Sequence, residues 1–466
     1  MDFMSIHNKA KKMDIFSQKA RLTDGWVENV RVTILDGHIE KIRIGVKPKS
    51  KDIRVDTLLP ALANLHSHSF QRAMAGMTEY RAAGRENFWT WRELMYRFLN
   101  YLTPEDISSI AAQTFMEMQK SGYAAVGEFH YIHHGSGGNT YDNPAELSVR
   151  IIEAAKLTGI GLTHLPVLYT YAGVQKQPLA GGQLRFGNSV DEICNIVSIS
   201  QKTISFLPPD ARVGIAPHSL RATTPSDIKE LLCCYSDKRV HMHIAEQTKE
   251  VSEVSEAFGA RPVEWLLENH AINTNWCLIH ATHMTQAETI GLAKTGAVVG
   301  LCPITEANLG DGIFEGPTFI KENGKIGVGS DSNINISLTE ELRTLEYSQR
   351  LRDQQRNVMI HTEGSVGEAL YLGAASGGAQ ALDRKAGSIA PGKLADLMAV
   401  DSCHTNLCAL RNDQLIDGLV FAAKDNVITD VWSAGRHQVR DGIHIEENNI
   451  QASYFKTITT LKKRLG

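Results

Sequence analysis

The sequence lacks the features that mark secreted, membrane-spanning or nucleic-acid-binding proteins. Its seven cysteines are odd in number and scattered, with no C-x-x-C pair, which is typical of free thiols in a reducing compartment. No apolar run approaches the ~18 residues of a membrane span, and the N-terminal residues contain no signal-type apolar stretch. The formal net charge is only −4 and no basic block is present. We therefore expect a soluble cytoplasmic protein with no membrane or nucleic-acid partner.

The two ends of the chain have the pattern of one small β unit. At 466 residues the chain exceeds the usual size of a single domain. Short alternating segments near the N-terminus are separated by Asp24-Gly25 and Asp36-Gly37, which are hairpin signals. Strand-like segments with turn residues between them return after Gly387. We expect residues 1–58 and 385–466 to form one discontinuous β-sandwich domain.

The middle of the chain alternates between apolar, β-rich stretches and segments of helical composition. Strands that alternate with helices indicate parallel pairing, and eight such units are typical of a (β/α)8 barrel, also called a TIM barrel. We therefore expect an α/β fold in which residues 59–384 form the barrel. The eight expected strands are 58–66, 123–131, 160–169, 212–218, 240–246, 276–283, 297–302 and 325–331.

The first of these strands ends in the motif His66-Ser-His68. Residues i and i+2 of a strand point to the same side, so both imidazoles would project together and form half of a metal site. The motif alone is weak evidence, because the chain has 18 histidines and a second such pair at His241 and His243. Its place at a strand end gives it weight.

Several other strands also end in residues that can bind metals or move protons. In a barrel of this type, reactive groups lie at the C-terminal ends of the strands. Those ends carry Glu128, His130, His218, His243, Glu246, His280, His283 and Asp331. A single histidine of this kind is more often a hydrogen-bonded core residue than a ligand. The set taken together favours a metal held by neutral imidazoles and one carboxylate, with the ligands His66, His68, His243 and Asp331.

Glu246 lies three residues after His243, so strand periodicity would send it to the opposite face. It must act from the loop just beyond the strand, which suits a proton shuttle better than a metal ligand. The alternative is a carboxylate at the N-terminus of the following helix, where the helix dipole favours negative charge. Its neighbour His243 favours the catalytic interpretation.

These motifs together resemble the metal-dependent amidohydrolase superfamily. The resemblance covers His-x-His after the first strand, His-x-x-Glu after the fifth, His after the sixth and Ser-Asp after the eighth. Residues Pro391–Asp396 resemble the sequence motif that begins the C-terminal part of the small β domain in that superfamily. The fourth strand ends in 216–221 with no lysine to bridge two metals. The resemblance therefore implies the mononuclear aminohydrolase branch, with one divalent ion per chain and zinc the expected metal.

Longer phrases resemble one family of that superfamily, the formimidoylglutamate deiminases of histidine degradation. These phrases are 64–76, 88–92, 128–134, 216–221, 243–247 and 302–312. The resemblance implies hydrolysis of N-formimidoyl-L-glutamate to N-formyl-L-glutamate and ammonia by a homodimer. It implies the substrate-binding residues Gln71, Arg92, Tyr131, His218 and Arg221. It also implies the catalytic residues Glu246, His280 and Asp331.

The chemistry of the two arginines agrees with a substrate that carries two carboxylates. The planar guanidinium of arginine binds a carboxylate through two hydrogen bonds. Arg92 lies in the long segment after the first strand and Arg221 just beyond the fourth, both at the expected barrel mouth. Either arginine alone is more often a surface or salt-bridge residue. Gln71 could instead cap a turn, and Tyr131 could be a core residue.

Two other interpretations of the site stay open from the sequence. The first is a related aminohydrolase that acts on a heterocycle such as guanine or S-adenosylhomocysteine, although two arginines at the mouth favour a dianion. The second is a barrel that binds a metal or metabolite without catalysis, which Glu246 and His280 argue against. Fold alone does not decide between them.

Overall fold

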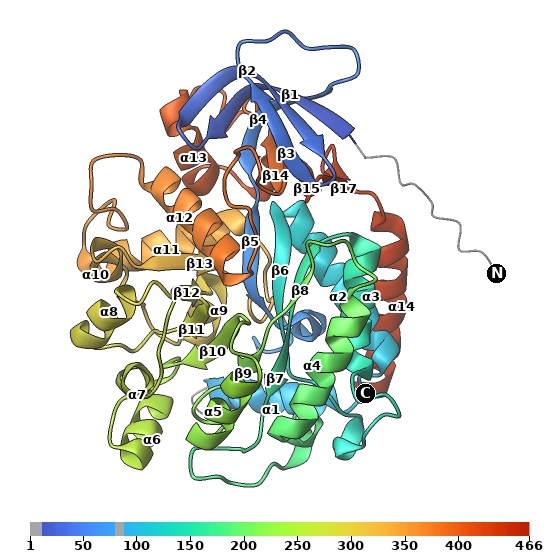
Figure 1. The fold of residues 1–466 in the computed structure, drawn as a ribbon, viewed down its shortest axis with the longest axis vertical. Coiled ribbons are helices and arrows are strands. Elements are labelled where there is room, and N and C mark those ends of the chain that lie inside the picture. Colours follow the sequence, from blue (N-terminus) through green and yellow to red (C-terminus); the bar gives the residue numbers. More distant parts are fainter. Residues whose placement is uncertain (1–11, 80–87, 466) are drawn as a thin grey trace, which may run out of the picture.

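The structure, a computed structural model, describes residues 12–79 and 88–465 and has two parts (Figure 1). A ring of parallel strands surrounded by helices forms the larger part, and a sheet covers one end of it. The side chains of residues 88–90 lie outside the described part, so of the motif 88–92 only Trp91 and Arg92 are placed with their side chains. The expected α/β fold with a (β/α)8 barrel is confirmed.

The covering sheet combines strands from both ends of the chain. It contains eight strands in the order β17-β16-β15-β14-β4-β1-β2-β3. The central strand β4 pairs in parallel with β1 and antiparallel with β14, which joins the two halves edge to edge. The hydrogen bonds therefore join strands from both ends of the chain into one continuous sheet. The strands are β1 Lys12–Leu22, β2 Gly25–Leu35, β3 His38–Arg43, β4 Ile53–Pro60, β14 Leu397–Val400, β15 Ile428–Ser433, β16 Arg436–Arg440 and β17 Ile443–His444.

The hairpin between β2 and β3 shows why the sequence turns where it does. Leu35 pairs with His38, which leaves Asp36 and Gly37 as a two-residue loop. Their φ values are +47° and +83°. Two consecutive positive φ angles are the requirement of the type I′ turn, and an Asp-Gly pair meets it at low steric cost. The predicted hairpin signal is confirmed at this position.

The eight barrel strands follow the predicted order. They form two parallel sheets, which isolated bridges Ile215–Val240 and Ser67–Asp331 join to each other. The fourth strand is split into two short pieces. The strands are β5 Leu62–Ser67, β6 Tyr123–His130, β7 Gly161–Leu168, β8 Arg212–Val213 with β9 Ala216–Pro217, β10 Val240–Ile244, β11 Trp276–His280, β12 Val298–Leu301 and β13 Lys325–Val328.

The helices begin at sequence signals that satisfy their first backbone N–H groups. At the start of α2, Thr103 Oγ1 accepts a hydrogen bond from Asp106 N at 3.2 Å, and Asp106 Oδ2 accepts one from Thr103 N at 3.0 Å. This reciprocal capping box recurs at α4, α5 and α8. The helices around the barrel are α1 Phe88–Leu99, α2 Pro104–Lys120, α3 Glu146–Thr158, α4 Val190–Ile204, α5 Pro225–Cys234, α6 Thr248–Phe258, α7 Pro262–Asn269, α8 Gln286–Ala293, α9 Pro303–Leu309, α10 Gly316–Lys321, α11 Leu338–Asp353 and α12 Val366–Ala381.

The segment 385–466, expected as part of the β unit, also contains two helices, α13 Asn412–Phe421 and α14 Glu447–Leu465. In Figure 1, α14 runs along the outside of the barrel beside α2. Polar pairs connect the two helices, including Lys120 with Glu447 at 2.7 Å and Asp106 with Arg464 at 2.9 Å. The last helix therefore packs on the barrel rather than on the small sheet.

A buried ion network connects the covering sheet to the base of the barrel, where the strands begin. Arg384 Nε and Nη2 each lie 2.9 Å from an oxygen of Asp396, and its Nη1 lies 3.1 Å from Asp210 Oδ2. The two terminal nitrogens of Arg436 donate hydrogen bonds to the carboxylate oxygens of Asp210 at 2.7 and 2.8 Å. Each charge is thus paired and hydrogen-bonded, as a buried charge requires. We call Arg384, Asp396, Asp210 and Arg436 the base network.

The membrane-span prediction and the cysteine prediction can both be compared with the described residues. Among them, no helix combines the length and the apolar composition that crossing a bilayer would take. All seven cysteines are free thiols, of which Cys277 and Cys302 are buried.

Candidate active site

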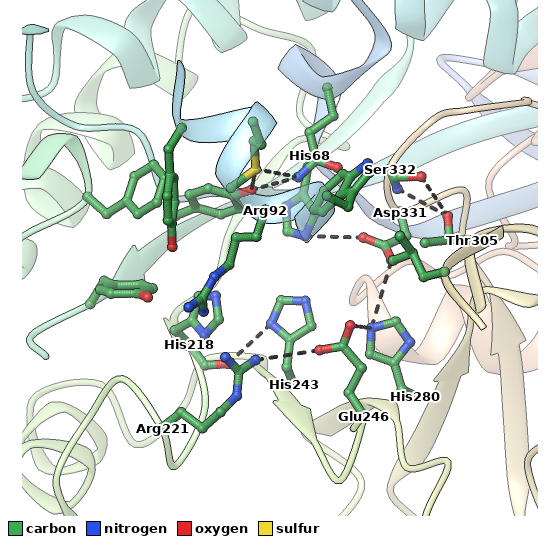
Figure 2. Close-up of a pocket in the computed structure, with 18 residues that line it drawn as sticks. His68, Arg92, His218, Arg221, His243, Glu246, His280, Thr305, Asp331 and Ser332 are labelled. Atoms are coloured by element: carbon green, nitrogen blue, oxygen red, sulfur yellow. Dashed lines mark hydrogen bonds and ion pairs between the residues drawn. The ribbon is translucent and has the colours of Figure 1, made fainter. Parts of the chain in front are cut away.

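Four side chains that the sequence analysis assigned as metal ligands converge at the mouth of the barrel. One ligand atom from each of His66, His68, His243 and Asp331 lies within 4.8 Å of all the others. Asp331 Oδ1 lies 3.2 Å from His68 Nε2 and 3.5 Å from His66 Nε2. The strands β5 and β10 and the loop after β13 bring these residues together from positions far apart in the sequence. Figure 2 shows three of them, His68, His243 and Asp331.

The backbone fixes the relative position of the first and last barrel strands at this cluster. Asp331 N donates to His66 O at 3.0 Å, and His68 N donates to Asp331 O at 2.9 Å. Asp331 itself has a φ of +44°, in the left-handed region that residues with a side chain seldom adopt. The two hydrogen bonds hold this conformation and place the Asp331 carboxylate beside the two imidazoles.

The donor set fits a divalent metal. His243 Nε2 faces His66 Nε2 at 3.0 Å, and burial lowers the pKa of His66 to about 3 and lowers the pKa of His243, so both rings are neutral. His68 Nδ1 donates to Phe129 O at 2.9 Å, and His243 Nδ1 donates to His218 O at 3.2 Å. Each Nε2 lone pair is then directed into the cluster, the usual arrangement of metal-bound histidines. A cation between these nitrogens would satisfy lone pairs that otherwise face each other.

Asp331 supplies the negative charge of the cluster. Burial opposes its ionisation, but the imidazoles of His66, His68 and His280 lie close to the carboxylate. These neighbours hold the pKa of Asp331 well below its ordinary value. Three neutral imidazoles and one carboxylate offer nitrogen and oxygen ligands, which suit zinc and similar divalent ions.

Glu246 and His280 lie beside this cluster, as expected. Glu246 Oε1 is 3.9 Å from His280 Nε2, and His280 Nε2 is 3.8 Å from Asp331 Oδ2. Burial raises the pKa of Glu246 above its ordinary value, so a proton is available on this carboxyl closer to neutral pH. Figure 2 shows the three side chains in a row from Glu246 through His280 to Asp331.

Glu306, which had no role predicted from the sequence, contacts His280 on the side away from Glu246. His280 Nδ1 donates to Glu306 Oε1 at 3.1 Å, and the same oxygen accepts from Cys302 N at 2.9 Å. This contact directs His280 Nε2 toward the pocket. Burial alone would lower the pKa of His280, but Glu246, Glu306 and Asp331 raise it to about 10.

The five residues expected to bind substrate all line the same pocket as the acid and base groups. Gln71 Nε2 donates to Tyr131 Oη at 2.7 Å, and His218 Nδ1 lies 2.9 Å from Ser219 Oγ. Arg92 extends from α1 toward Arg221 and His218 (Figure 2). The pocket thus contains two guanidinium groups on one side and the metal-ligand cluster with its proton donors on the other.

Three strand-end residues lie outside the metal cluster. Glu128 Oε1 accepts hydrogen bonds from Ser69 N at 2.8 Å and Ser69 Oγ at 2.6 Å. The ring of His130 lies 5.5 Å from the ring of His164, deeper in the barrel. His283 Nε2 donates to Asp311 O at 2.8 Å. These residues support the walls of the site instead of facing the ligands.

The sequence matches two family models and several known proteins. Residues 57–437 match the amidohydrolase family, and residues 13–56 match the N-terminal domain of the formimidoylglutamate deiminase HutF. Formimidoylglutamate deiminase of Pseudomonas aeruginosa is 45% identical over 450 residues, which cover 96% of this chain and 99% of that protein. A 5-methylthioadenosine/S-adenosylhomocysteine deaminase of Shouchella clausii is 28% identical over 63% of this chain and 69% of that protein.

Solved structures agree in fold over almost the full chain. An amidohydrolase from Brucella melitensis aligns with a TM-score of 0.92 and 42% identity, covering 96% of this chain and 99% of that one. An adenosine deaminase from Xanthomonas campestris with bound zinc aligns with a TM-score of 0.81 and 20% identity, covering 97% and 98% of the two chains. At that identity the likeness concerns the fold alone. The chain belongs to the amidohydrolase family and, within it, to the formimidoylglutamate deiminases.

Proposed function

We propose that this chain hydrolyses N-formimidoyl-L-glutamate to N-formyl-L-glutamate and ammonia, as a step of histidine degradation. Water adds its oxygen to the formimidoyl carbon, the C–N bond to the terminal nitrogen breaks, and that nitrogen leaves as ammonia. The observation that carries the proposal is one pocket with two arginines facing a metal-ligand cluster and its proton donors. The 45% identity to the deiminase of Pseudomonas aeruginosa supports the same substrate.

The proposal includes one divalent ion per chain, with zinc the expected metal, held by His66, His68, His243 and Asp331. When bound, such an ion activates water for attack near neutral pH. No second set of ligands is proposed, because strand β9 ends in Ala216-Pro217 and brings no lysine to the cluster.

The chain's own residues then move the protons. Asp331, which lies on the cluster, is placed to accept the proton that the attacking water loses. Glu246 is placed to deliver a proton to the departing nitrogen, and the raised pKa of its carboxyl keeps that proton available. His280 Nε2, which faces both carboxylates, is placed to hydrogen-bond the oxygen that adds to carbon.

Arg92 and Arg221 are proposed to bind one carboxylate of the substrate each. The fork of a guanidinium matches a carboxylate, and a buried charge pair of this kind both binds and orients. Burial opposes the charge on Arg221, but Glu250 and then Glu246 beside it raise its pKa. Gln71, Tyr131 and His218 line the wall between the arginines and the metal cluster and are proposed to position the rest of the substrate.

A heterocycle aminohydrolase is the alternative within the same family. Its support is the 28% identity to the deaminase of Shouchella clausii. That value is well below 45%, and two arginines in the pocket suit a dianion better than an uncharged ring. A non-catalytic barrel is the weaker alternative, because the acid and base groups stand beside the cluster.

The direct test is ammonia release from the purified, metal-loaded protein. Formimidoyl-glutamate should be turned over fastest among formimidoyl-glutamate, formimidoyl-aspartate, guanine and S-adenosylhomocysteine, with one metal ion per chain by elemental analysis. Faster turnover of either heterocycle would replace the proposed function by the alternative. Absence of turnover with all four would favour the non-catalytic barrel.

The arginine assignment has its own test. Arg92→Ala or Arg221→Ala should lower kcat/KM for formimidoyl-glutamate by an amount equivalent to about 2–5 kcal/mol, since each leaves a substrate carboxylate without its partner. Lysine at either position should restore only part of the activity, because it offers a point charge in place of a fork. On an analogue that lacks one carboxylate, the arginine that binds that group should lose its effect. If neither variant discriminates the analogue, the glutamyl substrate is wrong.

We also propose that the protein acts in the cytoplasm as a homodimer. The support is the similarity to the deiminase of Pseudomonas aeruginosa, with which this chain aligns over 96% of its length. Light scattering coupled to size exclusion should give the mass of two chains, and a monomer at micromolar concentration would contradict this part.

A further inference from the structure

Glu250 is a buried carboxylate that the proposed mechanism does not use. It lies in the first turn of α6, four residues after Glu246, and its side chain is 0% exposed. Glu256 on the same helix is exposed. An ionised carboxylate is costly to bury unless charged or hydrogen-bonding groups surround it. Its partners therefore show what it does.

The partners of Glu250 belong to the loop that carries Glu246. Glu250 Oε1 accepts a hydrogen bond from Ala245 N at 3.1 Å, and Glu250 Oε2 accepts one from Glu246 N at 3.2 Å. An ordinary capping carboxylate of a helix reaches back to the N-cap residue, which here is Gln247. Glu250 reaches past the N-cap and gathers two successive N–H groups of the loop onto one carboxylate.

These two hydrogen bonds explain how the Glu246 side chain reaches the pocket. Ala245 has a φ of +49°, a left-handed conformation that costs about 1–2 kcal/mol for a residue with a Cβ. The turn at Ala245 breaks the strand alternation that would otherwise direct Glu246 away from the metal cluster. Glu250 on one side and the bond from His283 N to Ala245 O, 3.0 Å, on the other hold that turn in place.

The same carboxylate also lies against Arg221. Arg221 Nε is 3.7 Å from Glu250 Oε2, while Arg221 Nη2 is 3.5 Å from Glu246 Oε2. Figure 2 shows the Arg221 guanidinium directed toward Glu246, with Arg92 extending toward the same side of the pocket. Glu250 thus contacts the backbone of the proton donor and the side chain of the arginine proposed to bind a substrate carboxylate.

We infer that Glu250 is a positioning residue that sets Glu246 and Arg221 relative to each other. One buried carboxylate then governs both the placement of the proton donor and the placement of a carboxylate-binding arginine. The inference rests on the proposed function for the identity of the substrate. Its geometric content, the link between Ala245, Glu246 and Arg221, does not depend on the substrate.

The first test is steady-state kinetics of Glu250→Gln, with Glu256→Gln as the matched control on the exposed side of the same helix. Glutamine keeps the shape but loses the charge, and it opposes an N–H donor with its own amide. Groups that orient the ligands of a metal site typically contribute about 10–100-fold, and we expect the same scale for Glu250. We expect kcat/KM to fall by that factor in Glu250→Gln, with kcat lowered and KM raised together, and no change in Glu256→Gln. Unchanged kinetics in Glu250→Gln would overturn the inference.

A double-mutant cycle separates positioning from simple helix stabilisation. In the Glu246→Gln background, adding Glu250→Gln should change kcat by less than about threefold, because the group it positions is already disabled. In the Arg221→Ala background, its effect on KM should shrink in the same way. A helix cap would instead lower thermal stability and leave the kinetic penalties to multiply independently, which would overturn the inference.

A further variant covers the case in which Glu250→Gln folds poorly. Glycine adopts positive φ without strain, so Ala245→Gly removes the need to hold that turn. Ala245→Gly combined with Glu250→Gln should recover folded protein while still showing the raised KM that comes from Arg221. Normal KM in this folded double variant would count against the link to Arg221.

A crystal structure of Glu250→Gln without substrate keeps the inference separate from the proposed function. The loop at Ala245 and Glu246 should move, and Arg221 should no longer lie within ion-pair distance of Glu246. An unchanged loop would overturn the inference even if the wild type deiminates formimidoyl-glutamate. A shifted loop in a protein that does not act on formimidoyl-glutamate would support the inference and refute the proposed function.

Discussion

The two ends of the barrel both bury charge, but they treat it differently. At the base, two arginines and two aspartates of the base network match each other in number and in hydrogen bonds. At the mouth, Glu246, Glu306 and Asp331 surround one histidine, His280, whose Nε2 has no hydrogen-bond partner within the described part of the chain. The base is complete as it stands, whereas the mouth has polar groups that a ligand can satisfy.

The backbone conformation does not separate the two ends in the same way. At the mouth, Ala245, His280, Ala281 and Asp331 all have positive φ angles where three strands end. Conformations of this kind cost free energy and persist only where surrounding contacts hold them. At the base, Asp383 beside Arg384 and Ala434, whose N donates to Asp396 Oδ1 at 2.7 Å, have positive φ angles as well. Neither buried charge nor positive φ by itself therefore marks a functional site; buried charge with open hydrogen-bonding capacity does.

The largest effect is expected where the mouth loses a ligand. His243→Ala should remove the metal and lower kcat at least ~10³-fold, because a metal contributes several kcal/mol of transition-state stabilisation. Elemental analysis and kcat should be measured on the same preparation. The matched control is His241→Gln on the same strand, since His241 donates to Ala381 O at 2.9 Å on the side away from the cluster. Full metal content in His243→Ala, or two ions per wild-type chain, would contradict the assigned ligands.

The next effect separates the proton donor from the ligands. Glu246→Gln should lower kcat by about 10²–10⁴-fold, the usual contribution of a positioned acid or base, while the metal stays bound. Turnover near that of the wild type would remove Glu246 from the mechanism. Loss of metal in this variant would instead make Glu246 part of the metal site.

The base network should respond in stability and not in catalysis. Arg384→Met should lower the free energy of unfolding by about 3–5 kcal/mol, because it leaves Asp396 buried without its partner. Denaturant unfolding gives the change, and kcat of the folded fraction should equal that of the wild type. Lys12→Met is the control, since Lys12 pairs with Glu40 at 3.6 Å on the exposed surface and should matter little. A lower kcat in Arg384→Met would show that the two ends are coupled.

The smallest effect concerns Glu128, a carboxyl at the mouth whose Oε2 makes no hydrogen bond to the described residues. Burial raises the pKa of Glu128 to about 7. A carboxyl whose pKa is raised on folding stabilises the protein below about pH 4.5, and this contribution is lost as the pH rises through 7. Glu128→Gln should lack this dependence, so the wild type should lose about 1–3 kcal/mol relative to the variant between pH 5 and pH 8. Parallel stability curves would contradict the raised pKa.

The metal cluster could be predicted from sequence because its signals are local. His66 and His68 are two residues apart at the end of one strand, and His243 and Asp331 each end another apolar stretch. Parallel strands of a barrel bring such ends together whatever the loops do. The eight strands were predictable for the same reason, since each is a short apolar run between helical segments.

Other features depend on contacts between distant segments and could not be predicted. Glu250 and Glu306 lie in the first turns of α6 and α9, where acidic residues are common in any protein because they favour the helix dipole. Only the folded chain shows that one reaches Ala245 and the other His280. The single covering sheet likewise depends on the pairing of β4 with β14, more than 300 residues apart in sequence.

The C-terminal helix α14 was missed although its signal was present. Ile450, Tyr454, Ile458 and Leu461 recur at helical spacing and all pack against the core. The strand-like pattern of the preceding residues drew the whole segment 385–466 into the β unit. Over residues 447–465 alone, the period of 3.6 indicates a helix.

The backbone bonds between Asp331 and the strand of His66 give the site a role in how the chain folds. The two residues are the first and last ligands in sequence, and the ring of strands closes where they meet. Such a long-range contact carries a large loop-closure cost, because the ends of a segment of more than 260 residues must be brought together. A chain arrested before residue 331 cannot assemble the complete ligand set. Metal uptake therefore reports that the ring has closed, and free metal in the cell shifts the balance toward the closed ring by mass action.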